Sequence, residues 1–212
     1  MTNNPQPVVE YLADLQHRLV YVQQGWGELG INTCAHAPGQ TPLPLRIRDK
    51  QYARGVGHHA PGEIVIDLNG EYEAFEAEVG VQWQNGNVGS VVFQVYVDGK
   101  KRFDSGVMRE TDAPKPVRVS VKGANELRLV VTDAGDGITC DCANWAEARL
   151  TRAIGRYRAR LAALVVRLEA VGDRGHGAER KRVAAEWAAA LLVVTVANLG
   201  EVDAVGGRLP VE

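Results

Sequence analysis

Hydrophobic and polar residues alternate with a period of two in several runs between residues 55 and 150. In the first run, Ile64, Ile66 and Leu68 fall on one face, and Glu63 and Asp67 fall on the other. A period of two with one polar face predicts half-buried antiparallel strands. The other runs place apolar residues at Phe75, Ala77, Val79, Val81 and Trp83, at Val91, Phe93, Val95 and Val97, at Val117, Val119 and Val121, and at Leu127, Leu129 and Val131.

Turn-forming residues separate these runs. Asp98-Gly99 lies between two apolar runs and is a strong hairpin signal, and Asn69-Gly70 follows another run. Prolines keep residues 34–44 out of a central strand, so we expect a loop there. Many short strands with frequent turns predict a mainly β fold, a jelly-roll β-sandwich, which we assign to residues 7–150.

The period changes after residue 150. Apolar residues then recur every three or four positions with arginines between them, which predicts an amphipathic helix. A Gly-rich break at residues 172–177 and a second apolar helix predict a helical hairpin over residues 151–200. Residues 201–212 show no period and are expected to fray. The helices can pack within the chain, or they can serve a protein partner or self-association.

The composition is that of an ordinary globular protein, with 212 residues, 45% hydrophobic, 24% charged and a formal net charge of -2. No block of Lys and Arg stands out, so we do not expect nucleic-acid binding. The longest uncharged stretch, Trp187–Gly200, is too short to span a membrane. The first residues lack the features of a secretion signal. We expect a cytoplasmic protein, or an extracellular one if the chain is a piece of a longer exported protein.

Cys34, Cys140 and Cys142 do not make a disulfide framework, because their number is odd. With His36 and the histidine pair that follows Gly57 they suggest a zinc site. However, one residue separates Cys140 from Cys142 instead of the usual two, and the other ligands would come from distant loops. Small buried thiols are the favoured interpretation, and the role of the three cysteines stays open.

The strands and their loops form an ordered series of motifs over residues 7–150. The members of the series are Gly25-Trp26-Gly27, Gly55 to Pro61, Glu63 to Leu68, Val92 to Gly99, Phe103 to Gly106, Glu126 to Asp133, and Asp141 to Ala146. This series resembles the NPCBM domain, which is also known as carbohydrate-binding module family 51. The resemblance implies a galactose-binding-like jelly roll that binds galactose-type sugars without catalysis. It also implies that a structural calcium ion is common.

The chain departs from the family pattern at two places. The family usually has a run similar to Asp-His-Ala-Asp-Trp-Ala, where this chain has Cys142 in place of the histidine and Asn144 in place of the second aspartate. Acidic residues often follow an earlier strand of the family, and this chain has Gln82-Trp83-Gln84 there. These departures favour a rival hypothesis, a structural or protein-interaction module that keeps the jelly roll but has lost sugar binding, with the helices mediating assembly.

A sugar site needs an aromatic face and planar hydrogen-bonding groups. We nominate His59, Gln82, Asn144 and Trp145 as carbohydrate-binding residues, because their segments can meet at one end of the sandwich. Trp145 is equally well explained as a core residue, and His59 as a residue that bonds the neighbouring backbone. Trp83 falls on the apolar face of its run, so we expect it in the core.

The segment Asp133-Ala-Gly-Asp-Gly137, with Asp141, supplies carboxylates of the kind that calcium prefers. A solvated turn built by Asp and Gly is the favoured interpretation of this segment. The metal site is therefore unknown, and structural Ca2+ is the one cofactor left open.

No carboxylate pair can be given acid and nucleophile roles from its spacing, so we do not expect an enzyme. The leading hypothesis is a non-catalytic carbohydrate-binding module that recognises a galactose-like residue of a glycan through a loop-end site.

Overall fold

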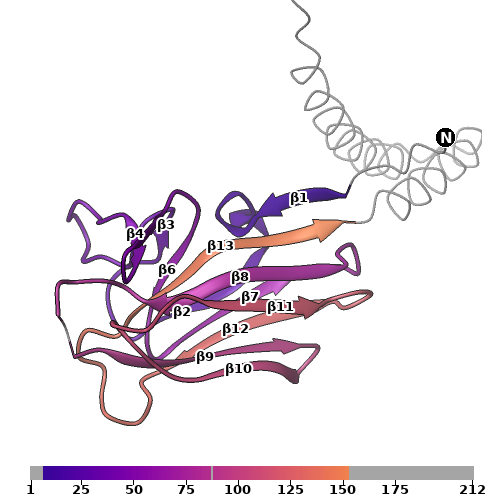
Figure 1. The fold of residues 1–212 in the computed structure, drawn as a ribbon. Coiled ribbons are helices and arrows are strands. Elements are labelled where there is room, and N and C mark those ends of the chain that lie inside the picture. Colours follow the sequence, from indigo (N-terminus) through magenta and orange to yellow (C-terminus); the bar gives the residue numbers. More distant parts are fainter. Residues whose placement is uncertain (1–6, 87, 153–212) are drawn as a thin grey trace, which may run out of the picture. The chain divides into compact units, whose positions relative to one another are not determined.

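The computed structural model describes residues 7–86 and 88–152, which form two antiparallel β-sheets packed against each other (Figure 1). Sheet A has the strand order β11-β8-β13-β6-β3, with β1 also paired to β13, and sheet B has the order β10-β9-β12-β7-β2. Strands β4 and β5 form a separate hairpin. The elements are β1 (Val8–Tyr11), two 3-10 helices (Leu12–Asp14 and Gln16–Arg18), β2 (Leu19–Gln23), β3 (Gly30–Ile31), β4 (Leu45–Ile47), β5 (Lys50–Tyr52), β6 (Gly55–His59), β7 (Gly62–Asp67), β8 (Ala74–Val81), β9 (Ser90–Val97), β10 (Lys100–Arg109), β11 (Lys115–Ser120), β12 (Glu126–Thr132) and β13 (Cys142–Arg152).

The register of sheet B follows from the alternation in the sequence. Leu129 of β12 lies opposite Ile64 of β7 on one side and Val95 of β9 on the other. All three side chains are buried, while the neighbouring Arg128 and Val130 are half-buried on the other face of the sheet. The predicted β-sandwich is confirmed, because a strand with period two must turn its apolar residues to one common side.

The core lies between the two sheets and is anchored by Trp145 and Phe93. The rings pack edge to face with centroids 5.0 Å apart, and both side chains are fully buried. Trp145 comes from β13 of sheet A and Phe93 from β9 of sheet B, so this pair joins the two layers. Edge-to-face contacts of this kind add to the free energy gained by burying the rings.

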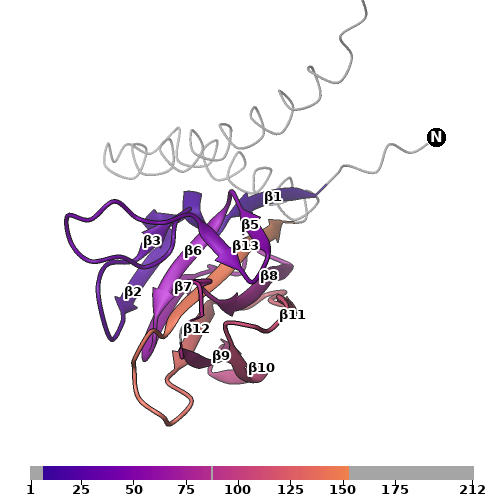
Figure 2. The same cartoon turned by 60° about the vertical axis from the view of Figure 1, so that its left-hand side comes forward.

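A second layer covers the outer face of sheet A. The hairpin of β4 and β5 packs Leu45, Ile47 and Tyr52 around Ala146 of β13, and Figure 2 shows β5 beside β6 and β13. Close packing requires a glycine below Ile47, because a Cβ on Gly80 would lie 2.3 Å from its Cγ2. Sheet A is therefore buried on both faces along this part of its strands.

Trp83 does not lie in the core as the sequence suggested. Strand β8 ends at Val81, and the backbone amide of Trp83 then donates to the carbonyl oxygen of Arg46 in β4, at 2.9 Å. The half-buried indole lies below the Arg46 guanidinium, whose central carbon is 5.4 Å from the ring centroid. The alternation of β8 does not extend to Trp83, because the chain there pairs with β4 and no longer continues the strand.

Strand β13 continues to Arg152, two residues beyond the predicted end of the sandwich, so the predicted start of the helical hairpin at residue 151 is wrong. The rest of the hairpin and the tail over residues 201–212 lie outside the described residues. The buried Arg152 bonds Glu10, Glu71 and the hydroxyl of Tyr72, which holds the end of β13 beside β1. Among the described residues no helix is long and apolar enough to cross a membrane.

Candidate functional site

Three of the motifs meet at one end of sheet A, where β6 and β8 end and β13 begins. His59 at the end of β6 is paired with Cys142 at the start of β13. The backbone amide of Gln82, just after β8, donates to the carbonyl oxygen of Cys142 at 2.8 Å. The loops that follow these strands therefore lie together, as the sequence interpretation required.

Gln82 and Asn144 are both fully buried beneath the β4 segment. The Asn144 side-chain amide donates to Gln82 Oε1 at 2.6 Å and to the Arg46 carbonyl oxygen at 3.2 Å. Gln82 Oε1 also accepts from the Arg46 backbone amide at 3.0 Å, and its Nε2 donates to the Pro44 carbonyl oxygen at 3.1 Å. In this arrangement the two side chains hold the outer layer on sheet A and offer no surface to a ligand.

Trp145, nominated as the aromatic of the sugar site, is a core residue in the structure. It has no exposed surface, and it lies on the same face of β13 as the buried Ala143. The alternation of β13 explains this position, because Asn144, next to it, points to the opposite face, under β4. The nomination is therefore corrected, since a tryptophan inside the sandwich cannot pack on a sugar.

The exposed aromatic at this end is Trp26, which was not nominated. Its side chain is 45% exposed, and its ring lies 5.4 Å from that of His59 with an interplanar angle of 53°. Gly25 allows this approach, because a Cβ there would lie 2.4 Å from the carbonyl oxygen of Ala60. The signal in the sequence was a tryptophan between two glycines, Gly25 and Gly27, outside every alternating run.

His59 is nearly buried, but one ring nitrogen still reaches solvent. Nδ1 lies 2.7 Å from the Ala60 carbonyl oxygen, which can only accept, so Nδ1 carries the proton. Nε2 is then an acceptor. It bonds no group in the described part of the chain, and it is not among the buried unbonded atoms. Burial lowers the pKa of His59, so the ring is neutral near pH 7 and can accept a hydrogen bond from a sugar hydroxyl.

His36, Gln84 and Cys142 belong to segments next to Trp26 and His59. His36 exchanges backbone hydrogen bonds with Glu28, next to Gly27, and a hydrogen bond joins the Cys142 side chain to Gln84. Burial raises the pKa of the Cys142 thiol to about 11, with Cys34 nearby adding to the shift, so the thiol stays protonated near pH 7. We call Trp26 and His59, together with His36, Gln84 and Cys142, the Trp26 site.

The loop after β8 owes its shape to a buried carboxylate. Glu110, at the end of β10, is 2% exposed, and its Oε1 accepts from the backbone amides of Gln84 (2.6 Å) and Gly86 (3.0 Å). A carboxylate that accepts hydrogen bonds from several backbone amides fixes a loop firmly, because charge-assisted hydrogen bonds are stronger than neutral ones. Gln84 is therefore held at the edge of the Trp26 site by a residue from the other sheet.

The segment nominated for calcium is organised by hydrogen bonds. Asp141 Oδ1 accepts from the Ser90 amide (2.9 Å), Asp136 Oδ2 accepts from the Ser90 hydroxyl (2.7 Å), and Asp133 Oδ1 accepts from the Gly135 amide (3.1 Å). Burial raises the pKa of Asp141 to about 6, and the charges of Asp136 and Asp133 add to this. Nowhere in residues 7–86 and 88–152 do three His, Cys, Asp or Glu side chains gather as metal ligands.

Comparisons with known proteins agree with this fold. The family model described as the NPCBM/NEW2 domain matches residues 9–151. The chain is similar to the CBM51 of Clostridium perfringens GH95 in complex with methyl-galactose, at 36% identity and a TM-score of 0.60, over 68% of this chain and 99% of that one.

Two further similarities concern longer proteins. The CBM51-2 and INT domains of Clostridium perfringens ZmpB match at 26% identity and a TM-score of 0.62, over 74% of this chain and 35% of that one. The same CBM51-2 is also known in complex with GlcNAc. A Renibacterium salmoninarum protein provisionally named endo-alpha-N-acetylgalactosaminidase is 28% identical over 66% of this chain. The chain spans 9% of the length of that relative.

Proposed function

Because this chain belongs to the NPCBM/NEW2 domain family, we propose that its sandwich is a non-catalytic module that binds a galactose-type residue of a glycan at the Trp26 site. The observation that carries the proposal is the exposed Trp26 ring set against the His59 ring at the end of sheet A. The similar GH95 module, which is known in complex with methyl-galactose, supports the choice of sugar.

The two rings supply the two kinds of contact that a sugar needs. The indole of Trp26 offers an apolar face for the C–H groups of the ring, and His59 Nε2 accepts a hydrogen bond from a hydroxyl. Because His59 is held by its bond to the Ala60 carbonyl oxygen, its acceptor keeps one direction, and this selects hydroxyls by their stereochemistry. The Trp26 site has no activated nucleophile, since burial keeps the Cys142 thiol protonated.

The affinity for a single sugar residue should be low, with a dissociation constant on the order of 1 mM. A hydroxyl that bonds the protein gives up a bond to water, so each hydrogen bond adds little net free energy. The module would then act by holding a larger protein near a glycan surface.

The test is a titration of methyl galactoside and methyl glucoside into the full chain, followed by NMR. We expect the galactoside to bind, and Trp26→Ala to weaken that binding at least tenfold, because the exposed ring supplies the apolar contact. Tyr21→Ala is the matched control, since Tyr21 is 53% exposed on β2 of the other sheet. Unchanged binding by Trp26→Ala, with its fold intact by circular dichroism, would contradict the site assignment.

The rival function is a structural or protein-interaction module in which the sugar site is lost. The observation that favours it is Cys142, a thiol beside His59 where the family pattern has a histidine. A wild-type chain that binds no sugar on a glycan array would support this rival and contradict the leading proposal.

We also propose that the module works outside the cell as part of a longer exported protein. The match to a small part of the Renibacterium relative supports this, because the module there is a minor segment of a large chain. Structural calcium remains a proposal as well. Its test is thermal unfolding with added CaCl2 and with EDTA, where bound calcium would raise the midpoint.

A further inference from the structure

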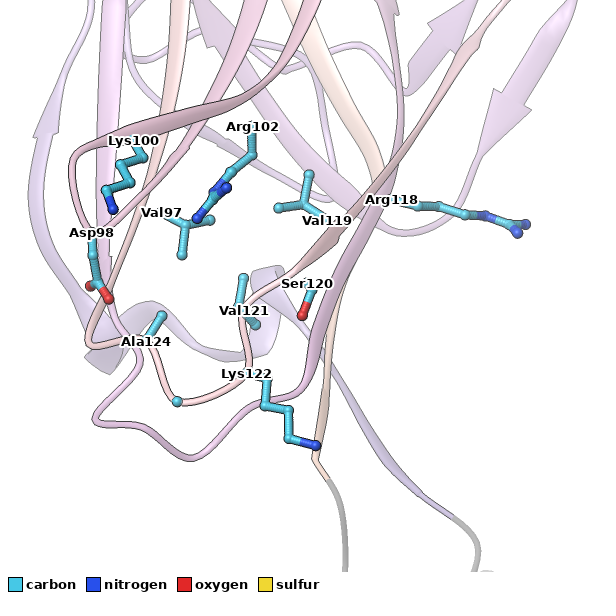
Figure 3. Close-up of a pocket in the computed structure, with 11 residues that line it drawn as sticks. Val97, Asp98, Lys100, Arg102, Arg118, Val119, Ser120, Val121, Lys122 and Ala124 are labelled. Carbon is cyan, nitrogen blue, oxygen red and sulfur yellow. The ribbon is translucent and has the colours of Figure 1, made fainter.

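The sandwich has a pocket at the end away from the Trp26 site, where the edge strands β10 and β11 of the two sheets diverge (Figure 3). Its volume is about 500 Å³, within the range of small-molecule sites. The floor is apolar and well packed, formed by the buried side chains of Val97, Val119, Val121 and Ala124. We call it the β10–β11 pocket.

Two cations line one wall of this pocket. Figure 3 shows Arg102 extending from β10 toward Val97 on the floor and Lys100 extending toward the Asp98 side of the pocket, whereas Arg118 and Lys122 point away from it. Within the part of the chain that the structure describes, neither Lys100 nor Arg102 forms an ion pair or a side-chain hydrogen bond. By contrast, Lys101 between them bonds Asp104 at 2.7 Å.

The positions of Lys100 and Arg102 follow from the alternation along β10, which also contains a bulge. Lys101 is paired with Tyr96 and Phe103 with Val95, so Arg102 is an extra residue with no partner on β9. Lys100 is opposite Val97, whose side chain is buried in the core, so Lys100 lies on the inner face of the strand. Alternation along β10 puts Arg102 on the same side as Lys100, two residues earlier, and the extra residue lets Phe103 face the core as well.

One acidic group, Asp98, also lines the β10–β11 pocket. Asp98 Oδ1 accepts hydrogen bonds from the backbone amides of Asn125 (3.0 Å) and Glu126 (2.9 Å), which fixes the turn between β11 and β12 and leaves the negative charge of the carboxylate in place. Lys122 and Arg118 have their own carboxylate partners at 3.6 Å, Glu73 and Glu76. Lys100 and Arg102 face the single carboxylate of Asp98, so the lining of the β10–β11 pocket keeps one net positive charge.

We propose that the β10–β11 pocket is a second binding site, for a saccharide that carries a sulfate or carboxylate group. Lys100 and Arg102 bind the anionic group, and the valine floor packs against the C–H face of the ring. This site goes beyond the proposed galactose site, because none of its residues belongs to the Trp26 site.

Inward charges on an edge strand also have a protective role, because they prevent the strand from pairing with another chain. The two roles give different results in a binding assay. Protection alone requires no ligand, whereas a binding site requires that an anionic sugar shift the signals of the pocket residues.

The experiment is a set of NMR titrations of the full chain with galactose 6-sulfate, glucuronic acid, galactose and inorganic sulfate. We expect the two acidic sugars to shift the amide signals around Lys100 and Val121, and galactose to leave them unchanged. The sulfated sugar should bind several-fold more tightly than inorganic sulfate, because only the sugar contacts the floor. Equal affinity for the two would overturn the assignment to a saccharide.

Charge-removing variants complete the test. The double variant Lys100→Gln with Arg102→Gln should lose at least tenfold in affinity for galactose 6-sulfate, and Lys101→Gln, on the same strand but paired to Asp104, should keep it. Raising the salt concentration should weaken wild-type binding. A wild-type chain that binds neither acidic sugar, or a double variant that binds them as well as wild type, would overturn the proposal. Galactose binding by the double variant keeps this result separate from the Trp26 site.

Discussion

At the residue scale, the burial of His58 makes the free energy of unfolding depend on pH. It has no exposed surface, and its Nε2 donates to the Gln23 carbonyl oxygen at 2.9 Å. Burial lowers its pKa to about 4, with the neighbouring His59 adding to the shift. The folded state thus keeps His58 neutral in a pH range where the unfolded chain, with a pKa near 6.5, takes up a proton.

This residue predicts a loss of stability in mild acid. Because the folded pKa is depressed, the stabilisation is complete above about pH 6.5 and is lost as the pH falls toward 4. The loss reaches about 3 kcal/mol, by the conversion of pKa shifts into free energy. The measurement is the free energy of unfolding in urea at several pH values for wild type and for His58→Gln, whose amide can still donate to the Gln23 carbonyl oxygen.

The variant should show a shallower fall between pH 6.5 and 4.5 than wild type, since the other titrating groups are shared. His17→Gln, at an exposed position of the second 3-10 helix, is the control and should parallel wild type. Parallel curves for wild type and His58→Gln would show that His58 does not cause the acid sensitivity.

At the scale of elements, the outer layer on sheet A depends on glycines in the strands below it. A Cβ on Gly57 of β6 would lie 2.4 Å from Cα and the carbonyl carbon of Cys34, and these are backbone atoms that cannot turn aside. At Gly80 of β8 the nearest atoms belong to the Ile47 side chain, which can adopt another rotamer. The two positions therefore differ in how a clash can be relieved.

We expect Gly57→Ala to displace the segment around Cys34 and to lower the free energy of unfolding by about 1–3 kcal/mol, the usual cost of overpacking. The displaced Cys34, buried in the wild type, should then react faster with a thiol reagent, as measured by mass spectrometry of the labelled peptide. Gly80→Ala should leave the labelling rate of Cys34 near the wild-type value. An unchanged rate in Gly57→Ala would refute the dependence on this contact.

The same outer layer explains what the sequence could and could not predict. Alternating strands such as β7, with Ile64 and Ile66 buried between more exposed neighbours, were predictable because one face is buried and the other is more open. The hairpin of β4 and β5 was not predictable, because strands of three residues are too short to show an alternating pattern. Gln82 and Asn144 look like free polar residues in the sequence, and only the long-range position of Arg46 shows that they are bonded inside.

The candidate site was predictable in its place but not in its aromatic residue. The sequence analysis expected the segment of His59 at one end of the sandwich, and the structure has His59 at the end of β6, where it pairs with Cys142 of β13. Trp145 and Trp26 could not be distinguished by residue type, because both stand in family motifs. The direction of the Trp145 ring depends on the register of β13, and that of the Trp26 ring depends on the close contact of Gly25 with Ala60. Neither can be deduced from the residue types alone.

At the scale of the whole sandwich, the two proposed sites lie at opposite ends of the same strands. Strand β8 begins at Ala74, which is paired with Ser120 beside the β10–β11 pocket, and ends at Val81, next to Gln82 and the Trp26 site. Its eight residues span roughly 25 Å at the usual rise per residue. That separation is about three Debye lengths at physiological salt, so charges at one end have little effect at the other.

We therefore expect the two ends to bind independently. Saturating the chain with methyl galactoside should leave the dissociation constant for galactose 6-sulfate at the pocket unchanged within twofold, and the reverse should hold because coupling between sites is reciprocal. The measurement is a pair of NMR titrations, each repeated with the other ligand at saturation, with signals near Trp26 and Val121 reporting the two ends. A change of fivefold or more would mean that the rigid core between the sheets transmits binding. Independence has a consequence for glycans: a sulfated disaccharide is too short to reach both ends at once, so it should bind two per chain without any gain in avidity.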